Sequence, residues 1–395
     1  MEFVIRLGGK VVMNNKRIGI LTHYYGSNNY GGILQAYALC RKLNLMGYSA
    51  EQICYPLHEP MSLQELSKRL NRNMSLEKIL TIVPRKILYI TNNYKNSNIL
   101  LDRYKSFSEF REKSIPHSKE LYLDSTIANC VDDYDIFITG SDQVWNPIWF
   151  RKGFFLDFVP KKKKKIAYAA SIGQSTLTNE QRTLMKHKLA DFYAISVREK
   201  SSVKLLSEIT SCKIEWVLDP TMLLPMPEWD AVCSEQLVAG PYILCYFLGN
   251  ALLGRKMAEQ FAMQHKLSVV NIPMLGKYNK LDGFGDIKLC NASPNDFISL
   301  IKYADCIFTD SFHACVFSIL YRKQFYAFNR DDGRSMISRI ESILEIIHGE
   351  KRLIEDSNLC GIAQINDIAP IDYTGNREKL MLMRQKSESF LIDNL

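Results

Sequence analysis

Three polar residues that suit proton transfer stand close together in the stretch TDSFHACVFSIL, residues 309–320. Asp310, Ser311 and His313 lie where a predicted strand ends and a predicted helix begins. In one interpretation Asp310 or Ser311 caps the helix, and the histidine simply occupies its first turn. In the other, His313 faces a site at the edge of a cleft and transfers protons there. Its place on a strand-to-helix loop favours the second interpretation.

An arginine occupies a similar position in the stretch SVREKS, residues 196–201. At the end of a predicted strand, Arg198 could bind a carboxylate or a phosphate through two parallel hydrogen bonds. Taken alone, however, the stretch fits a surface Arg198–Glu199 region without a ligand better.

The loop GSDQVWNP, residues 140–147, has a composition that suits a sugar. It follows a buried-type strand and contains Asp142, Gln143, Trp145 and Asn146. An indole can stack on a sugar ring, while carboxylate and amide groups bind its hydroxyls. A structural turn with Trp145 in the core explains the same residues equally well.

A glycine-bearing loop, GSNNYGG, residues 26–32, follows the first predicted strand. It contains Asn29, Tyr30 and Gly31, and its glycines permit a ligand to approach the backbone closely. The loop matches neither the dinucleotide-binding pattern nor the phosphate-loop pattern. A plain tight turn is therefore as good an interpretation as a binding loop.

These loops separate segments that alternate between strand and helix patterns, which is typical of α/β domains with parallel sheets. Residues 16–225 are expected to form one such domain, with a helical insertion at about 60–115 that could cover a site. A second domain is expected at 238–350 after a linker at 225–240, and a helix at 376–395 that packs back across both. Because ligands bind at the carboxyl ends of parallel strands, the two domains imply a binding cleft between facing sheet edges.

The composition argues against several classes of protein. The chain of 395 residues has no apolar run of about 18 residues, so no membrane-spanning helix is expected. Its ten cysteines form no Cys-x-x-Cys pair, which indicates reduced thiols, no metal site and a cytoplasmic location. The net charge of +8 favours anionic small molecules or lipid head groups over nucleic acid. We interpret the run Lys161–Lys165 as a solvated loop, with contact to a membrane surface as the alternative.

An ordered set of stretches resembles the polysaccharide pyruvyl transferase family. The stretches lie between about residue 17 and about residue 350, in the order IGILTHYYGSNNYGGILQAYAL, TGSDQVWNP, IAYAASIG, SVRE, VLDPTMLL, SPNDFISLIKYAD and TDSFHACVFSIL. The resemblance implies a GT-B-like fold, in which two Rossmann-like domains face each other across a cleft. It also implies transfer of pyruvate from phosphoenolpyruvate to a sugar, usually as a ketal that bridges two hydroxyls, for example a 4,6-ketal on a hexose such as galactose. The product would belong to a bacterial capsular or surface polysaccharide.

The resemblance also suggests roles for individual residues. Family members use an arginine at the position of Arg198 and a histidine at that of His313. Some members have a basic residue two places before the histidine, where this chain has Ser311, and the usual glycine after the histidine is Ala314. Arg339 or a lysine could supply the missing positive charge.

These considerations divide the candidate residues among three roles. We expect His313 to transfer protons and Asp142 to orient or deprotonate the acceptor. The co-substrate phosphoenolpyruvate is expected to bind at Arg198, Ser311 and Arg339. The acceptor sugar is expected to bind at Asn29, Tyr30, Gly31, Gln143, Trp145 and Asn146. This scheme requires no metal and no further cofactor.

Two other functions remain open at this point. A GT-B glycosyltransferase would need a carboxylate placed for the ribose of a nucleotide sugar, and the second domain offers no clear candidate. A non-catalytic glycan-binding protein of the assembly machinery is the other alternative, supported best by Ser311 and Ala314. The basic run Lys161–Lys165 is consistent with a lipid-diphosphate-linked acceptor at the cytoplasmic face of the inner membrane.

Overall fold

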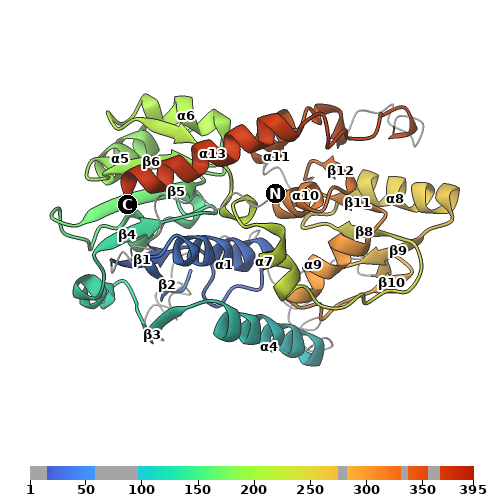
Figure 1. Ribbon diagram of the computed structural model, residues 1–395, viewed down its shortest axis with the longest axis horizontal. Helices are drawn as coiled ribbons and strands as arrows, with labels where there is room; N and C mark the ends of the chain where they lie inside the picture. The colour runs from blue at the N-terminus through green and yellow to red at the C-terminus, as the bar shows by residue number, and fades with distance from the viewer. Residues whose placement is uncertain (1–15, 58–96, 275–282, 331–336, 355–364) are drawn as a thin grey trace, which may run out of the picture.

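The computed structural model describes residues 16–57, 97–274, 283–330, 337–354 and 365–395, and the structural statements below concern these ranges. Their strands form two separate parallel sheets, which Figure 1 shows in two lobes. The predicted α/β class, with two Rossmann-like domains, is confirmed by this arrangement.

The first sheet has, within the described ranges, seven parallel strands in the order β3-β2-β1-β4-β5-β6-β7. The strands are β1 (Arg17–Leu21), β2 (Ser49–Cys54), β3 (His117–Leu121), β4 (Ile136–Thr139), β5 (Lys164–Ala170), β6 (Ala194–Val197) and β7 (Ile214–Trp216). The helices of this lobe include α1 (Tyr30–Leu45), α5 (Asn179–Leu189) and α6 (Lys200–Ser207). The strand order reverses between β1 and β4, so the loops that follow these two strands open onto the crevice where such sheets bind ligands.

The second sheet has six described parallel strands in the order β10-β9-β8-β11-β12-β13. They are β8 (Tyr242–Tyr246), β9 (Ser268–Asn271), β10 (Ile287–Lys288), β11 (Cys306–Thr309), β12 (Gln324–Phe328) and β13 (Leu353–Ile354). Its helices include α8 (Leu252–His265), α9 (Pro294–Tyr303), α10 (Phe312–Leu320) and α11 (Ile337–Ile346). Here the order reverses between β8 and β11, and the stretch TDSFH leads out of β11.

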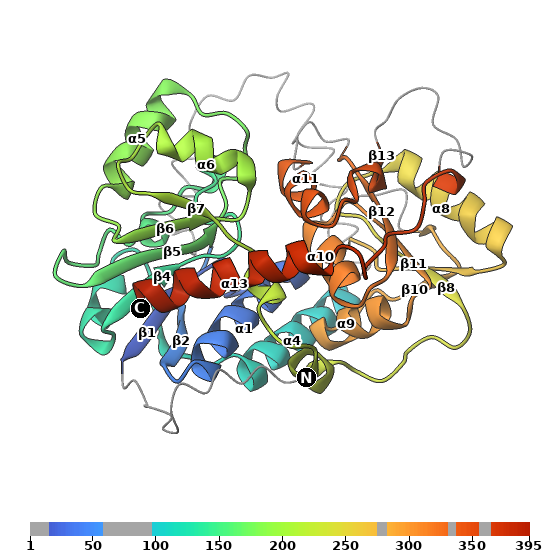
Figure 2. The same cartoon turned by 45° about the horizontal axis from the view of Figure 1, so that its top comes forward.

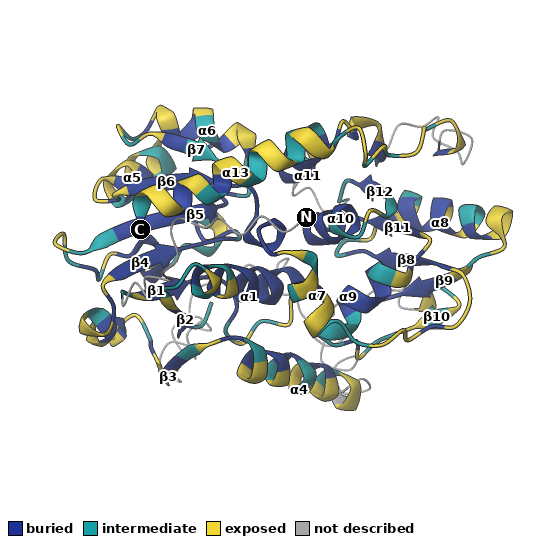
Figure 3. Ribbon diagram, in the orientation of Figure 1, coloured by how far each residue is buried: buried dark blue, intermediate teal, exposed yellow. Residues whose placement is uncertain are grey.

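The central strands are apolar along their whole length because helices cover both faces of each sheet. All residues of β4, β8 and β11 are buried, and so are most residues of α1 and α10. Figure 3 shows these elements as the dark interior of the two lobes. One buried cluster that runs through both lobes, together with a further cluster in each lobe, thus supports the ends of β1, β4, β8 and β11.

A short helix, α7 (Met226–Val232), lies in the segment 225–240 that was expected to be an irregular linker. It is ordered because it carries Trp229, which is fully buried at the junction of the domains. The Trp229 ring packs 5.5 Å from the Tyr37 ring of α1 and 4.8 Å from the Phe317 ring of α10, measured between centroids. Its Nε1 donates a hydrogen bond of 3.1 Å to the Thr221 carbonyl. The linker therefore fastens one domain to the other.

The helical insertion expected at about 60–115 can be followed only in part, because residues 58–96 lie outside the described ranges. Its last part is helix α4 (Ser97–Ser114), which contacts both α1 and α9. The Arg103 guanidinium lies 5.0 Å from the centroid of the Tyr30 ring and donates a 3.0 Å hydrogen bond to the Pro273 carbonyl. The described part of the insertion thus bridges the two lobes, and none of its residues lines the cavity described below.

Helix α13 (Arg377–Asn394) runs from the second lobe across to the first, as Figures 1 and 2 show. Lys379 at its start donates to the Glu345 carbonyl of α11, and Phe390 near its end packs against Tyr168 of β5. Between them, the Ser387 hydroxyl accepts a 2.9 Å hydrogen bond from the Leu218 backbone N–H. Neither α13 nor any other described helix has the length and apolar character that crossing a membrane requires.

Replacing Trp229 by alanine tests the role of the linker helix. We expect Trp229→Ala to lower the free energy of unfolding by about 3–5 kcal/mol, because it leaves a cavity between the domains. Urea unfolding followed by circular dichroism measures this change. Met263→Ala, at a position 79% exposed on α8, is the matched control and should change the value by less than about 0.5 kcal/mol. Equal effects of the two substitutions would show that α7 does not hold the domains together.

Candidate active site

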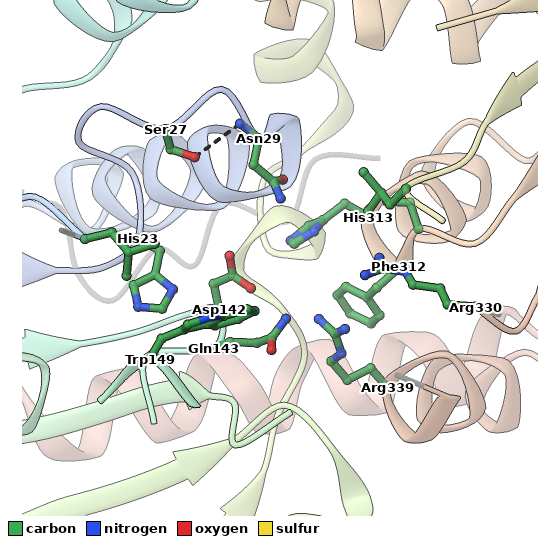
Figure 4. A pocket seen from close by; sticks show the side chains of 13 residues that line it. His23, Ser27, Asn29, Asp142, Gln143, Trp149, Phe312, His313, Arg330 and Arg339 are labelled. Carbon is green, nitrogen blue, oxygen red and sulfur yellow. Dashed lines mark hydrogen bonds between the residues drawn. The ribbon is translucent and has the colours of Figure 1, made fainter. Parts of the chain in front are cut away.

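A cavity of about 350 Å³ lies where the two sheets face each other, within the ~300–1,000 Å³ range of small-molecule sites. It is lined by His23, Ser27, Asn29, Leu57, Asp142, Gln143, Trp149, Leu248, Ser311, Phe312, His313, Arg330 and Arg339. Most of these residues follow β1, β4, β8 and β11, the four strands at the two order reversals. Figure 4 shows Asn29, Asp142 and Gln143 reaching in from the first domain, and His313, Arg330 and Arg339 from the second.

The loop after β4 places two of the predicted residues in the cavity. Asp142 has a left-handed backbone conformation, with φ of 66°, which an aspartate tolerates better than most residues. Gln143 is held by Asn146, whose Nδ2 donates to the Gln143 Oε1 over 2.7 Å. Asn146 itself does not line the cavity. The predicted direct contact between Asn146 and the acceptor is therefore replaced by an indirect role, in which Asn146 orients the Gln143 side chain.

Trp145 does not face the cavity, so the prediction that its indole stacks on a sugar is wrong. The side chain is only 1% exposed, its Nε1 donates to the Phe154 carbonyl, and its ring stacks on Phe155. The half-buried Trp149, four residues later, lines the cavity instead. The alternative interpretation of the loop, a structural turn with Trp145 in the core, holds for this residue.

The loop after β1 contributes the N-terminus of α1. Asn29 lines the cavity and caps the helix, since its Oδ1 accepts a 3.2 Å hydrogen bond from the Gly32 N–H. Tyr30 is fully buried, and its hydroxyl donates to the Ala292 carbonyl over 2.6 Å, so its predicted contact with the acceptor is wrong. Gly31 meets the catalytic candidate rather than a ligand: a Cβ added there would overlap the imidazole of His313.

The loop after β11 supports both interpretations of the stretch TDSFH. Ser311 caps α10 by accepting a hydrogen bond from the Ala314 N–H, at 3.5 Å, and it also lines the cavity. Asp310 points away from the cavity and accepts 2.7 Å hydrogen bonds from the N–H groups of Leu248 and Gly249. His313 lies in the first turn of α10 and faces the first domain.

A buried carboxylate that the sequence analysis did not single out lies behind the cavity. The Asp219 Oδ2 accepts a 2.9 Å hydrogen bond from Arg198 and a 3.1 Å one from the Ser141 hydroxyl, and lies 3.5 Å from the His313 Nε2. The Oδ1 accepts from the N–H and hydroxyl of Thr221. Sequence alone identifies Asp219 as the end of a strand before Pro220, but β7 ends at Trp216 and Asp219 caps the 3₁₀ turn Pro220–Met222. Asp219 lies in VLDPTMLL, one of the stretches that resemble the family, and this was the sequence signal that it has a role beyond capping the turn.

Arg198 lies at the end of β6, as expected, but it does not line the cavity. Its side chain is 1% exposed, and its second terminal nitrogen lies 3.2 Å from the Asp142 Oδ1. The guanidinium also lies 4.4 Å from the centroid of the Phe312 ring. Arg198 and His313, predicted to converge on one small molecule, thus meet at the carboxylate of Asp219.

These contacts keep both carboxylates ionised. Burial alone would raise the pKa of Asp219, but the close contact with His313, together with the charge of Arg198, lowers it well below its ordinary value. Burial also opposes ionisation of Asp142, and Arg198, His313 and His23 lower its pKa in the same way. In return, the carboxylates of Asp142 and Asp219 outweigh the burial of Arg198 and raise its pKa.

Two arginines bring positive charge to the cavity itself. Arg339, predicted to bind the donor, lies on α11, and burial with the nearby charges of Arg198 and Arg330 lowers its pKa to about 9. Arg330, which the sequence analysis missed, follows β12, and its Nε lies 3.7 Å from the Asp310 Oδ2. Asp142 is the only carboxylate among the described residues that line the cavity. Among the same residues of the chain, no group of three or more His, Cys, Asp or Glu is placed to hold a metal ion.

Fold and site together define a GT-B-like α/β protein with an interdomain cavity in which cationic groups outnumber the anionic ones. The family model of polysaccharide pyruvyl transferase matches residues 29–332, most of the chain. The chain therefore belongs to the polysaccharide pyruvyl transferase family. This membership supports the prediction that the protein is a transferase. The match includes the loops that carry Asp142, Arg198 and His313. No curated protein matches the chain significantly.

Solved structures with a similar chain trace include sugar-nucleotide enzymes. The S. aureus MnaA–UDP co-structure has 12% identity and a TM-score of 0.48, over 94% of this chain and 91% of that one. The UDP-GlcNAc 2-epimerase from Methanocaldococcus jannaschii has 10% identity and a TM-score of 0.47, over 93% and 92%. The glycosyltransferase SnogD from Streptomyces nogalater has 10% identity and a TM-score of 0.41, over 95% and 96%. The assignment rests on the family model and not on these likenesses.

Substitution of Asp219 tests the buried network through its pH dependence. Because the pKa of Asp219 is lowered on folding, its carboxylate stabilises the fold above the unfolded pKa of about 3.9, and this contribution is lost as the pH falls toward the folded value. Asp219→Asn should lower the free energy of unfolding by about 3–5 kcal/mol at neutral pH, since the buried Arg198 guanidinium loses a counter-charge. The deficit should shrink by about 1.4 kcal/mol per pH unit below about pH 4.

Urea unfolding between about pH 7 and pH 3 measures this deficit. Glu208→Gln removes an exposed carboxylate that pairs with Arg182 over 2.9 Å at the surface, and it should cost less than about 1 kcal/mol. A deficit for Asp219→Asn that stays constant across the pH range would mean that its charge does not stabilise the fold.

Proposed function

We propose that the chain transfers the pyruvyl group of phosphoenolpyruvate to two hydroxyls of a sugar, forming a cyclic ketal for a bacterial surface polysaccharide. The observation that carries this proposal is the cavity between the domains, where His313, Arg330 and Arg339 face Asp142 across a space of about 350 Å³. Family membership supports it independently and favours it over transfer from a nucleotide sugar.

The donor is assigned to the second-domain side of the cavity. Phosphoenolpyruvate carries a phosphate and a carboxylate, and so requires fixed positive charge. Arg330 and Arg339 face this side, and the N-terminal end of α10 adds positive potential. A bound anion would relieve the repulsion that contributes to the lowered pKa of Arg339. Ser311, at the cap of α10, stays a candidate for contact with the donor.

Arg198 receives a different role from the one the sequence suggested. Its terminal nitrogens bind Asp142 and Asp219, so we assign it to holding these two carboxylates rather than to direct contact with the donor. The assignment is consistent with the importance of this arginine in the family, because removing it would leave two buried negative charges without a counter-charge.

The proposed chemistry uses His313 first as an acid and then as a base. The protonated imidazole, attracted by Asp219, gives its proton to the methylene carbon of the donor, and positive charge develops at the neighbouring carbon. A sugar hydroxyl attacks that carbon and returns its proton to His313. The bond between carbon and the phosphate oxygen then breaks, inorganic phosphate leaves, and the second hydroxyl closes the ketal while its proton passes to phosphate or water.

Asp142 is assigned to orienting the acceptor. A general base works best with a pKa near the working pH, and the pKa of Asp142 is lowered by Arg198 and His313 against the effect of burial. Of the two roles predicted for it, accepting a hydrogen bond from a sugar hydroxyl therefore fits better than removing its proton. A lipid-diphosphate-linked acceptor and peripheral contact with the inner membrane stay predictions from the basic character of the chain.

Incubation with phosphoenolpyruvate and methyl β-D-galactopyranoside or related methyl pyranosides tests the function. We expect release of inorganic phosphate together with a sugar whose mass has gained one pyruvate less one water. In heavy water the new methyl group should carry one deuterium, because its third hydrogen comes from solvent through His313. His313→Ala should reduce the rate by about 100- to 10,000-fold. Turnover unchanged in His313→Ala, or phosphoenolpyruvate left intact with every sugar, would refute the proposal.

The contact between Gly31 and His313 gives a second kinetic prediction. A Cβ at position 31 would displace the imidazole, and an error of about 1 Å in a catalytic group can cost about 100-fold in rate. Gly31→Ala should therefore lower kcat about 100-fold, although alanine favours helix α1. Gly283→Ala is the matched control, because a Cβ there meets no atom of the described residues within 4 Å, and it should leave kcat unchanged. Comparable rates for both variants would mean that His313 does not act from the position seen here.

A further inference from the structure

We propose that Trp149 is the surface on which the ring of the acceptor sugar stacks, and that Gln143 and Asp142 bind its hydroxyls beside it. The inference rests on the proposed function and specifies its acceptor subsite as one for a pyranose. It replaces the buried Trp145 with a residue that lines the cavity.

The cavity has two chemically different walls. Arg330, Arg339 and the first turn of α10 form a cationic wall suited to a small anion. Across from it, Trp149, His23 and Leu57 present aromatic and aliphatic surface, as Figure 4 shows for the first two. An anionic donor is held best by the two arginines of the cationic wall. The apolar surface of Trp149 and Leu57 on the second wall suits a neutral ligand with one apolar face.

Trp149 is held in place by a built turn rather than by a loose loop. It ends the 3₁₀ turn Pro147–Trp149, which Asn146 caps by accepting a 3.0 Å hydrogen bond at its Oδ1 from the Ile148 N–H. The Trp149 N–H donates to the Asn146 carbonyl over 3.0 Å, and Pro147 fixes the backbone at the start of the turn. The backbone that carries the indole is therefore fixed before a ligand arrives, which lowers the entropic cost of binding.

The same asparagine also orients the polar part of the subsite. Its Nδ2 donates to the Oε1 of Gln143, so the amide NH₂ of Gln143 remains to donate to a ligand in the cavity. Gly173 packs against this pair, and a Cβ there would meet both the Gln143 Oε1 and the Asn146 Nδ2. Asp142 adds an ionised acceptor, held by Arg198 at 3.2 Å. The Gln143 amide, a hydrogen-bond donor, and the Asp142 carboxylate, an acceptor, thus line the same cavity as the Trp149 ring.

This combination is the chemistry of pyranose recognition. The apolar face of the ring covers the indole, while hydroxyls at its edge accept from Gln143 and donate to Asp142. A sugar placed in this way has its hydroxyl edge toward His313 and the cationic wall, where the donor carbon would lie. Trp149 would therefore determine which sugars bind, without taking part in the proton transfers.

Saturation-transfer NMR with methyl β-D-galactopyranoside and methyl β-D-glucopyranoside tests the proposal on the full chain. We expect saturation transfer to at least one of these sugars in the unchanged protein. In Trp149→Ala its dissociation constant should rise roughly tenfold, equivalent to about 1.4 kcal/mol. Trp149→Phe keeps a stacking ring and should stay within about threefold of the unchanged protein. Trp216→Phe, at a half-buried tryptophan outside the cavity, is the matched control.

The donor is followed separately, by the rise in melting temperature that phosphoenolpyruvate causes. If stabilisation by phosphoenolpyruvate persists in Trp149→Ala while sugar binding is lost, the subsite is as proposed. If sugar binding is the same in Trp149→Ala, or if neither pyranoside binds the unchanged protein, the inference fails while donor binding stands. If phosphoenolpyruvate itself gives no stabilisation, it is the proposed function that fails.

Discussion

The site depends on one buried carboxylate that two domains share. Asp219 stands at the end of the first domain, receives Arg198 from β6, and lies 3.5 Å from His313 of the second domain. Burying these charges is costly, and only their mutual contacts and the added hydrogen bonds from Ser141 and Thr221 offset the cost. The contact between Asp219 and His313 can therefore form only when both lobes are in contact. Trp229 and helix α13, which also join the lobes, hold them in the arrangement that this contact needs.

Two layers of positive charge follow from this arrangement, and they differ in function. The inner layer is Arg198, whose pKa is raised by the two carboxylates it holds despite its burial. The outer layer is Arg330 and Arg339, which face a cavity with a single carboxylate among its described lining residues. Burial and the nearby charges of Arg198 and Arg330 lower the pKa of Arg339 to about 9. Arg198, the inner layer, holds the two buried carboxylates in place. Arg330 and Arg339, the outer layer, are the arginines that an anionic ligand in the cavity would contact.

Sequence patterns predicted where chemistry would lie better than which side chain would perform it. The loops after β1, β4, β6 and β11 were identified because apolar runs followed by glycine or polar residues mark strand ends in α/β folds. The same reasoning chose Trp145 and did not consider Trp149, because only packing decides which of the two indoles faces the core. It overlooked Asp219, because the residue was interpreted only as the end of a strand before Pro220. The short edge strands β3, β10 and β13 were missed because few apolar residues mark them.

In the function proposed above, Arg330 supplies the positive charge that Ser311, unlike the basic residue of some family members, does not carry. Some members carry a basic residue where this chain has Ser311, and a hydroxyl alone cannot replace a cation in binding an anion. Arg330 approaches the same loop from the end of β12, with its Nε 3.7 Å from the Asp310 carboxylate and a terminal nitrogen 3.5 Å from the Asp310 carbonyl. Asp310 in turn is fixed by the N–H groups of Leu248 and Gly249. Ser311 caps α10 more effectively than a long basic side chain could. The guanidinium of Arg330 approaches the same loop.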